Sequence, residues 1–317
     1  MSVPLPEGLK RRLRPIPQWS AIALRDPQDA VDVRLRHSGV DLDITRNNVV
    51  AALSPLTIAV GLDAATPRVS GRAPATIAFV DRMSGFLLGE LRLRGSGTVS
   101  AADARLDLFE IDRGAHWCLP WPHKTWNTWM QNRAIRANAD PYNFALQPAA
   151  AQQLMIFYLC PRPVVLVSVD DGTHSNLFPM DLIGPIAGDR FTLALRSTSR
   201  SVPVMRSVGR IALSSVAAAD HQIAYRLGVH HRNVKVDWSA LPFEVMRSAV
   251  YSLPIPAIAL RVREVDVLHA ETIGSHTFFV TRAVSDTRSS EAPQFFHTCG
   301  IHQYFRTRQG RPFDPAT

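Results

Sequence analysis

The clearest pattern of strands and turns lies in residues 160–208, CPRPVVLVSVDDGTHSNLFPMDLIGPIAGDRFTLALRSTSRSVPVMRSV. Val164–Val169 is a continuous apolar run, which is typical of a strand that is buried on both faces. The pair Asp171-Gly172 predicts a tight hairpin turn, because glycine tolerates the positive φ that such a turn needs. Ser175–Ile183 is then the partner strand. Pro179 confines this strand to a sheet edge or marks a bulge, since proline cannot donate a hydrogen bond to a ladder.

The same stretch ends in a candidate anion site. Phe191–Arg196 predicts a third strand, and a short helix that ends at Gly209 follows it. Between strand and helix stand four polar or charged residues, Ser197, Thr198, Ser199 and Arg200. A helix start offers unpaired N–H groups and the positive end of a dipole, and Arg196 and Arg200 add full charges. The sequence therefore predicts that this junction binds an anion.

The composition describes a folded protein without a membrane span. The chain has 317 residues, of which 46% are hydrophobic and 20% are charged, and this length fits two domains of ordinary size better than one. No apolar run is long enough for a transmembrane helix, and the N-terminus lacks the apolar core and cleavage site of a signal peptide. Three cysteines make no disulfide framework, so we expect a cytoplasmic location.

The net charge of +8 comes almost entirely from arginine. A basic balance suits nucleic acids, and it suits anionic small molecules such as nucleotide cofactors equally well. Apart from Lys10–Arg14, the arginines are scattered singly among apolar residues, and no known nucleic-acid motif is present. We therefore expect a small-molecule substrate as the partner, and neither a nucleic acid nor a membrane.

The first part of the chain is predicted to be β-rich. Residues 1–20 contain four prolines and are interpreted as an irregular arm. From residue 21 to residue 120, several runs such as Val31–Arg36 alternate between apolar and polar residues, and turn residues separate them. A Trp-rich connector with helices follows. We place a domain boundary in this connector, so that the N-terminal domain spans 21–145 and the C-terminal domain spans 146–317.

The second part of the chain predicts a small barrel. Further strands are expected at 210–216, 257–267, 277–284 and 298–307, with a helical segment at 217–227. Mostly antiparallel strands with two short helical insertions indicate a small closed or split barrel. The predicted fold class is thus mainly β, with a barrel in the C-terminal half and an additional β-rich domain before it.

Four segments, in this order, resemble the flavin reductase-like family of FMN-binding split barrels. They are PRPVVLVSVDDGTHSNLFPMDLIG from residue 161, FTLALRSTSRSVPVM from residue 191, IPAIALRVREVDVLHAETIGSHTFFVTRAV from residue 255 and HQYFRTRQGRPF from residue 302. The resemblance covers about half of the chain, and its weight lies in the order of the segments rather than in a single motif. It implies a split β-barrel that binds FMN, with FAD as an alternative.

The resemblance also implies which residues hold the cofactor. The segment from Asn176 to Ile183, including Pro179, Met180 and Asp181, would flank the isoalloxazine ring, largely through backbone groups. The phosphate would be held by Ser197, Thr198 and Ser199, beside Arg196 and Arg200. This assignment agrees with the anion site that the residues predict without the family.

One histidine is the candidate catalytic residue. The resemblance matches His276 with a loop histidine near the flavin and the nicotinamide. Two positions depart from the family pattern, because Asp181-Leu182 stands where a pair of serines is usual and Ser275 replaces an aspartate. A carboxylate beside a flavin is unfavourable unless it is paired or turned away, so the surroundings of Asp181 bear directly on the cofactor.

The leading hypothesis is a flavin-dependent oxidoreductase in which NAD(P)H reduces bound FMN. Proteins of this family commonly dimerise, so the resemblance implies a homodimer. Plain reductases of this type have one domain, so the N-terminal module suggests a role in holding an organic substrate or a partner. The alternative hypothesis is a non-catalytic module that binds a flavin, haem or a deazaflavin.

Three other clusters of residues are candidate sites. His297, Cys299 and His302 carry ligand types that suit zinc, as do His116, Cys118 and His123, but each cluster is short and lacks a distant fourth ligand. No metal is therefore expected. Four tryptophans, at 117, 121, 126 and 129, suit an interdomain core or, as the alternative, contact with a substrate.

Overall fold

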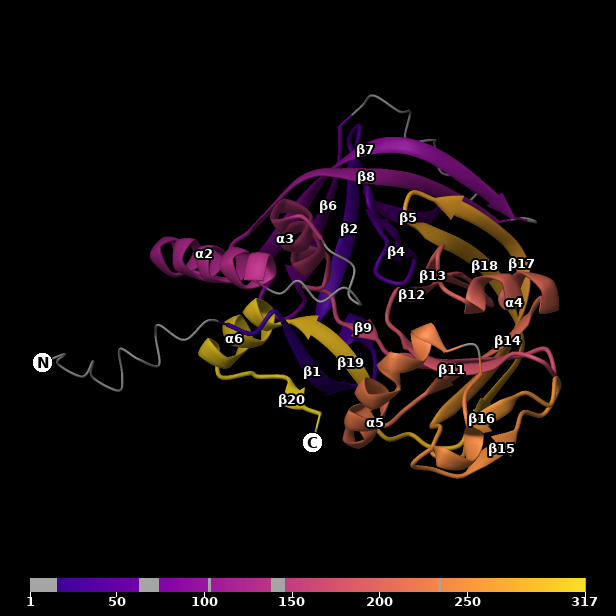
Figure 1. Ribbon diagram of the computed structural model, residues 1–317. Coiled ribbons are helices and arrows are strands. Elements are labelled where there is room, and N and C mark those ends of the chain that lie inside the picture. Colours follow the sequence, from indigo (N-terminus) through magenta and orange to yellow (C-terminus); the bar gives the residue numbers. More distant parts are fainter. Residues whose placement is uncertain (1–15, 63–73, 102–103, 138–145, 234, 317) are drawn as a thin grey trace, which may run out of the picture.

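The computed structural model describes residues 16–62, 74–101, 104–137, 146–233 and 235–316, and its strands form two seven-stranded antiparallel sheets. The N-terminal sheet has the order β3-β2-β6-β7-β8-β5-β4 (Figure 1). Its strands are β2 (Val31–His37), β3 (Val40–Asp43), β4 (Asn48–Leu53), β5 (Leu56–Leu62), β6 (Ala75–Asp81), β7 (Leu87–Ala101) and β8 (Ala104–His116). The prediction of a β-rich N-terminal portion is confirmed.

The C-terminal sheet has the order β11-β10-β14-β17-β18-β13-β12. Its strands are β10 (Val165–Asp170), β11 (Ser175–Met180), β12 (Ile183–Ala187), β13 (Arg190–Arg196), β14 (Arg210–Ser215), β17 (Arg261–Ile273) and β18 (His276–Arg288). The two edge strands, β11 and β12, follow each other in the chain with only residues 181 and 182 between them. The sheet must therefore curl until its edges meet without pairing, which is the geometry of a split barrel, as predicted.

A small sheet and the helices join these parts. The small sheet has the order β20-β1-β19-β9, with β1 (Trp19–Leu24), β9 (Arg162–Pro163), β19 (Gln294–Cys299) and β20 (Asp314–Pro315). The helices are α2 (Trp121–Ala137), α3 (Pro148–Phe157), α4 (Ser201–Val208), α5 (His221–Arg226) and α6 (Gly300–Arg308). Short elements complete the chain: the 3-10 turns η1 (Pro27–Asp29), η2 (Ala218–Asp220), η3 (Leu227–Arg232) and η4 (Trp238–Ala240), and the pair β15 (Val245–Arg247) and β16 (Pro254–Pro256).

Side-chain patterning explains the main strands. In β2, the side chains of Val31, Val33 and Leu35 are buried while the residues between them are partly exposed, as the alternation in the sequence predicts. In β10, residues 165–169 are all buried because both faces of the strand are covered. Pro179 lies in β11, which is an edge strand, as predicted.

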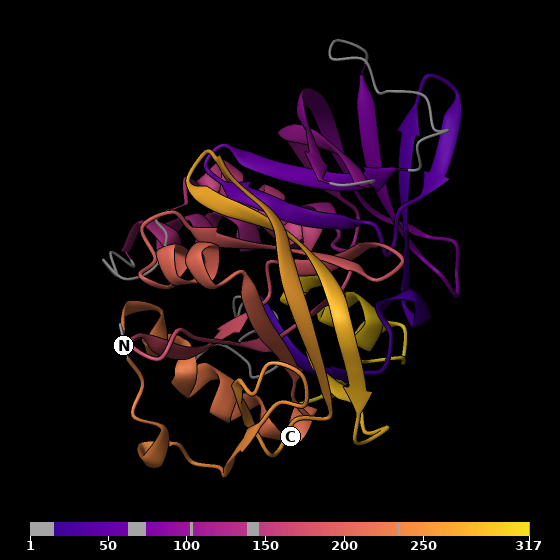
Figure 2. The ribbon, with the colours of Figure 1, turned by 90° about the vertical axis from the view of Figure 1, so that its right-hand side faces the viewer.

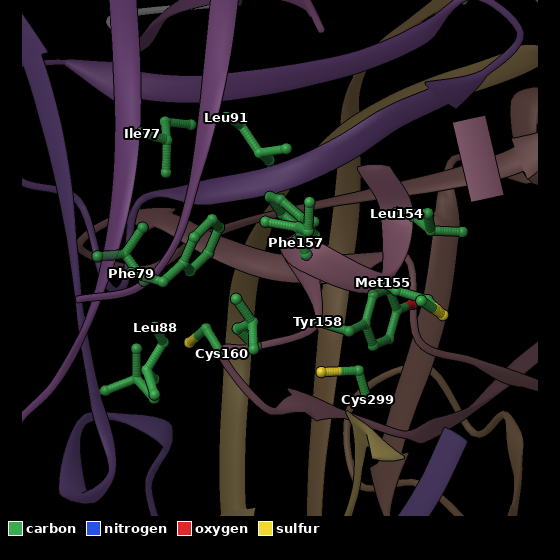
Figure 3. Close-up of a cluster of buried hydrophobic side chains, with 14 of the residues drawn as sticks. Ile77, Phe79, Leu88, Leu91, Leu154, Met155, Phe157, Tyr158, Cys160 and Cys299 are labelled. Carbon is green, nitrogen blue, oxygen red and sulfur yellow. The ribbon is translucent and has the colours of Figure 1, made fainter. Parts of the chain in front are cut away.

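The largest core cluster lies between α3 and the N-terminal sheet. Figure 3 shows Ile77, Phe79 and Leu91 of that sheet facing Phe157 and other residues of the α3 segment. The same cluster includes Cys299 from the end of β19, so the C-terminal part of the chain shares this core. The two parts of the chain are therefore packed together by buried apolar surface, which is the main source of folding stability. The boundary near residue 145 stays a prediction.

The structure corrects three local predictions. The expected strand Ser175–Ile183 is two strands, because the chain crosses from one sheet edge to the other at residues 181 and 182. The turn after β10 is centred on Gly172 and Thr173, since the Asp171 N–H bonds to the His174 carbonyl at 3.0 Å. The expected strand 298–307 is mostly helix α6, whose buried Ile301 and Phe305 repeat at a helical spacing.

Candidate functional site

The predicted anion site is an exposed turn between β13 and α4. The side chains of Ser197, Thr198 and Arg200 are exposed there, and Ser199 is half-buried. Helix α4 ends at Gly209 with a φ of 67°, as predicted, and no side chain caps its start. Exposed hydroxyls, a guanidinium and an uncapped helix start therefore lie together, which is a suitable arrangement for a phosphate or carboxylate.

A second turn packs against the anion turn. The Ser197 N–H bonds to the Ser275 carbonyl at 3.1 Å, and the Thr277 hydroxyl bonds to the Ser197 hydroxyl at 3.3 Å. Ser275 lies at the tip of the long β17–β18 hairpin, which reaches toward the first strands of the N-terminal sheet in Figure 2. The Ser275 N–H bonds to the Ser54 carbonyl at 2.9 Å. Three turns, from β13–α4, β17–β18 and β4–β5, thus meet at the site.

The candidate catalytic histidine is buried beneath this meeting point. His276 has only 2% of its surface exposed, and its Nδ1 lies 2.8 Å from the Ser275 hydroxyl and 3.5 Å from the Leu53 N–H. Burial, with the charge of Arg196, lowers the pKa of His276 to about 4. Arg196 is half-buried and is the cross-strand neighbour of His276. At neutral pH the imidazole is therefore neutral and can position the turns by accepting hydrogen bonds.

The outer edge of β11, which the resemblance assigns to the isoalloxazine ring, is covered by other residues of the chain. Asn176 is 2% exposed, and its side-chain amide donates to the Ser201 hydroxyl at 3.1 Å and to the carbonyls of His230 and Asn233 at 2.9 and 3.1 Å. Along the outer edge of β11, His230 Nδ1 lies 2.8 Å from the Leu177 carbonyl oxygen.

Further contacts close the same edge. The Val236 N–H bonds to the Ser175 carbonyl at 2.9 Å, and the His231 side chain bonds to the Pro179 backbone. Met180 is buried in the barrel core, and Pro179 is half-buried. The backbone groups of Ser175, Leu177 and Pro179 on this edge thus bond to Val236, His230 and His231 of the same chain.

Asp181 is paired with His297 and Tyr158. Its Oδ2 accepts a hydrogen bond from His297 Nδ1 at 2.9 Å, and the buried Tyr158 hydroxyl donates to the same carboxylate. Burial alone would raise the pKa of Asp181, but the hydrogen bonds from His297 and Tyr158 and the charge of His297 lower it. The other His297 nitrogen, Nε2, lies 3.0 Å from the hydroxyl oxygen of the half-exposed Tyr225. An Asp–His–Tyr chain of this kind can pass a proton between the phenol and the imidazole.

The remaining candidates are placed as follows. In the described part of the chain no group of three His, Cys, Asp or Glu residues is arranged to hold a metal ion. Cys299 and His302 are fully buried, on β19 and α6. No described helix is long and apolar enough to cross a membrane. The tryptophans do not form an interdomain core, because Trp117, Trp121, Trp126 and Trp129 are all at least one-third exposed, and α2 buries only Asn127 and Gln131.

Comparison with known proteins finds similarity at the level of structure. No protein-family model and no curated protein matches the sequence. Among solved structures, an FMN-binding protein from Thermus thermophilus is 21% identical, with 40% of this chain and 71% of that chain covered and a TM-score of 0.37. An NADH:FAD oxidoreductase from Streptomyces globisporus is 17% identical, with 47% and 88% covered and a TM-score of 0.42. The flavin reductase component of a bacterial two-component tryptophan halogenase is 19% identical, with 44% and 87% covered and a TM-score of 0.40.

These neighbours are the kind of protein that the sequence motifs suggest. Flavin reductase-like, FMN-binding proteins resemble part of this chain, as predicted from the four segments. At these identities and TM-scores the likeness concerns the fold, and it assigns neither a substrate nor a cofactor to this chain.

Two parts of the site were not foreseen from the sequence. The first is the β4–β5 turn at Leu53–Pro55, which lies more than 200 residues from the hairpin tip that it contacts. The second is the pairing of Asp181 with His297 and Tyr225. Only the Ser-Pro pair at 54 and 55, a common turn signal, marked either of them in the sequence.

Proposed function

We propose that this chain is a flavin-dependent oxidoreductase that binds the phosphate of FMN at the turn between β13 and α4. The observation that carries the proposal is the exposed group of Ser197, Thr198 and Arg200 at an uncapped helix start. Charge-assisted hydrogen bonds from such groups are the usual means of holding a phosphate. The proposal includes NAD(P)H as the reductant and an organic compound as the final substrate.

The fit of FMN to the residues differs between its two ends. The phosphate fits the turn at 197–200, where the donors are exposed. The outer edge of β11 offers the ring fewer groups, because the Asn176 amide is bonded to His230 and Asn233 and the Ser175 carbonyl to Val236. We therefore assign the ring no contact on that edge. When bound, the flavin would supply the redox chemistry, and the chain's own residues would bind and orient it.

The test compares two matched double variants of α4. Ser199→Ala with Arg200→Ala removes the donors at the start of the helix, and Arg206→Ala with Ser207→Ala makes the same change near its end. We expect the first variant to weaken FMN binding about 10- to 150-fold, which corresponds to about 1.5–3 kcal/mol for a charge-assisted bond. The second should bind FMN within about twofold of the unchanged chain.

Quenching of flavin fluorescence gives the affinity. The loss of NADH or NADPH absorbance in the presence of added FMN gives the turnover. Equal affinities for the two double variants would place the phosphate elsewhere. An unchanged chain that binds no flavin would refute the proposal.

A second candidate function is a flavin-binding module without turnover. The covered edge of β11 favours it, because Asn176 and its neighbours offer no free groups to a ring. Tight binding of FMN without oxidation of NADH or NADPH would decide for this second function.

A further inference from the structure

The two seven-stranded sheets have the same strand order. When the strands of each sheet are numbered from 1 to 7 along the chain, β2–β8 give the order 2-1-5-6-7-4-3, and so do β10–β14 with β17 and β18. All neighbours in both sheets are antiparallel. Consecutive hairpins alone would place only sequential strands side by side. The shared order also contains two pairs of neighbours that are not sequential, so it is a specific topology.

The two sheets also share local features. In each, strands 6 and 7 are the longest and form one hairpin, β7–β8 in the first and β17–β18 in the second. Each of these hairpins contains two bulges. In each sheet strands 2 and 3 are the opposite edges and follow each other in the chain. The N-terminal sheet is thus built on the plan of the C-terminal split barrel, with a short link between β6 and β7 where the C-terminal sheet has residues 216–260.

The contacts between the sheets are reciprocal. Strand 3 of one sheet, β4, packs on strand 3 of the other, β12; β4 also packs on β13, and β12 also packs on β5. The approach is close, because a Cβ on Gly184 of β12 would lie 3.2 Å from the Asn48 carbonyl of β4, and one on Gly61 of β5 would collide with the Ile186 carbonyl of β12. In an interface between two identical subunits, element i contacts element j of the partner and j contacts i. Within this chain the β4–β13 and β5–β12 contacts correspond in this way, and β4 makes an additional contact with β18 of the C-terminal sheet.

The apolar side chains at this contact come from both sheets. One buried cluster joins Val49, Ala59 and Leu106 of the N-terminal sheet with Ala194 and Phe278 of the C-terminal sheet, among others. The contact is thus a packed core rather than a loose surface.

We infer that the chain is a fused pair of split barrels in which the N-terminal barrel takes the place of a second subunit and completes the anion site of the C-terminal barrel. Leu53–Pro55, the turn between strands 3 and 4 of the N-terminal barrel, holds the β17–β18 tip through the bond from Ser275 N–H to the Ser54 carbonyl and the bond of 3.0 Å from Ser54 N–H to the Ser275 hydroxyl. Ser275 in turn accepts the Ser197 N–H. This gives the N-terminal barrel a role, because it covers the C-terminal sheet at β12, β13 and β18.

The first experiment is the mass of the native particle, which needs no ligand. We expect the mass of a single chain, 35.1 kDa, by native mass spectrometry and by light scattering at micromolar concentration. A stable particle of two chains would overturn the inference that one chain satisfies this interface.

The second experiment tests the shared anion site, and its FMN part rests on the proposed function. Ser54→Glu places a negative charge on the N-terminal barrel beside the anion turn, and Ser96→Glu places the same charge on an exposed position of β7. Calorimetry measures binding of inorganic pyrophosphate and of FMN to both variants. We expect Ser54→Glu to weaken both at least tenfold and Ser96→Glu to change neither more than twofold.

The outcomes separate the two proposals. Pyrophosphate binding that depends on Ser54, without any FMN binding, keeps the shared anion site and refutes the flavin function. Affinities that do not differ between the two variants, or an unchanged chain that binds neither anion, overturn the shared site. Circular dichroism of both variants confirms that each has folded.

Discussion

At the scale of single residues, Asp181 shows how a partly buried carboxylate is kept charged, with 32% of its side chain exposed. His297 and Tyr158 both donate to it, and the pKa of Asp181 is lowered as a result. Replacing Asp181 with alanine would leave the buried Tyr158 hydroxyl and His297 Nδ1 without this acceptor. We expect the free energy of unfolding to fall by about 2–3 kcal/mol, because unsatisfied buried donors are costly.

Urea unfolding at pH 7.5 measures the effect of Asp181→Ala. Asp189→Ala is the matched control, since that carboxylate is exposed in the turn before β13. A loss for Asp181→Ala no larger than for Asp189→Ala would show that the Tyr158 and His297 side chains do not depend on the carboxylate.

The sequence located Asp181 as an unusual residue but could not show how it is accommodated. Its partner His297 lies 116 residues further along the chain, and the sequence marks that histidine only as a possible zinc ligand. The anion turn at 197–200 was predictable, because hydroxyls, arginines and a helix start are neighbours in the sequence. The contrast has a physical origin. Hydrogen-bond donors that are neighbours in the chain form a recognisable sequence pattern, whereas two residues that only folding brings together do not.

At the scale of elements, the docking of the β17–β18 hairpin on the β4–β5 turn depends on a glycine. Gly274 has a φ of +50°, and a Cβ there would collide with the Ser54 carbonyl oxygen. We expect Gly274→Ala to lower the free energy of unfolding by about 2–5 kcal/mol, the sum of left-handed strain of about 1–2 kcal/mol and overpacking of about 1–3 kcal/mol.

Gly172→Ala is the control for the strain alone. Gly172 also lies in a hairpin turn with a positive φ, +86°, but no neighbouring atom is within 4 Å of its Cβ position. It should cost only about 1–2 kcal/mol in the same urea titration. Equal losses for the two variants would mean that the hairpin tip is not held tightly by the β4–β5 turn.

Most elements could be predicted from the hydrophobic period and the turn residues, and the two that could not have separate causes. Strands such as β2 and β8 alternate clearly, and the connector helices were expected. The division of 175–183 into β11 and β12 was missed because the apolar and polar pattern runs through the crossing at Asp181 without a break. The expected strand 298–307 is mostly helix α6, and the pair Ile301 and Phe305, buried four residues apart, is too short a signal to predict a helix.

At the scale of the whole molecule, three buried histidines make the free energy of unfolding depend on pH. His116, at the end of β8, and His276, between the two sheets, have pKa values lowered to about 4, mainly by burial. For His302, in α6, burial lowers the pKa to about 3. The side chains lie in different parts of the molecule, so each adds its own dependence on pH to the stability of the whole.

The sign of this dependence follows from proton binding. In the unfolded chain these histidines titrate near their ordinary pKa of about 6.5, while in the folded chain they stay neutral to about pH 4 or below. The unfolded state therefore binds more protons in this range, and each histidine reduces the free energy of unfolding by about 1.4 kcal/mol per pH unit below about 6.5. Carboxylates with lowered pKa values, such as Asp81 and Asp181, act only at lower pH.

We therefore expect the protein to lose stability steeply between pH 6 and pH 5, and His302→Phe to reduce that loss by about 1.4 kcal/mol per pH unit, the contribution of one histidine. Phenylalanine suits the position because His302 is fully buried with its ring against Phe313, at 4.9 Å between ring centroids. His269→Phe is the control, since it makes the same replacement at a partly exposed position. The measurement is a set of urea titrations at half-unit steps of pH. An unchanged slope for His302→Phe would show that this histidine already takes up its proton in the folded state.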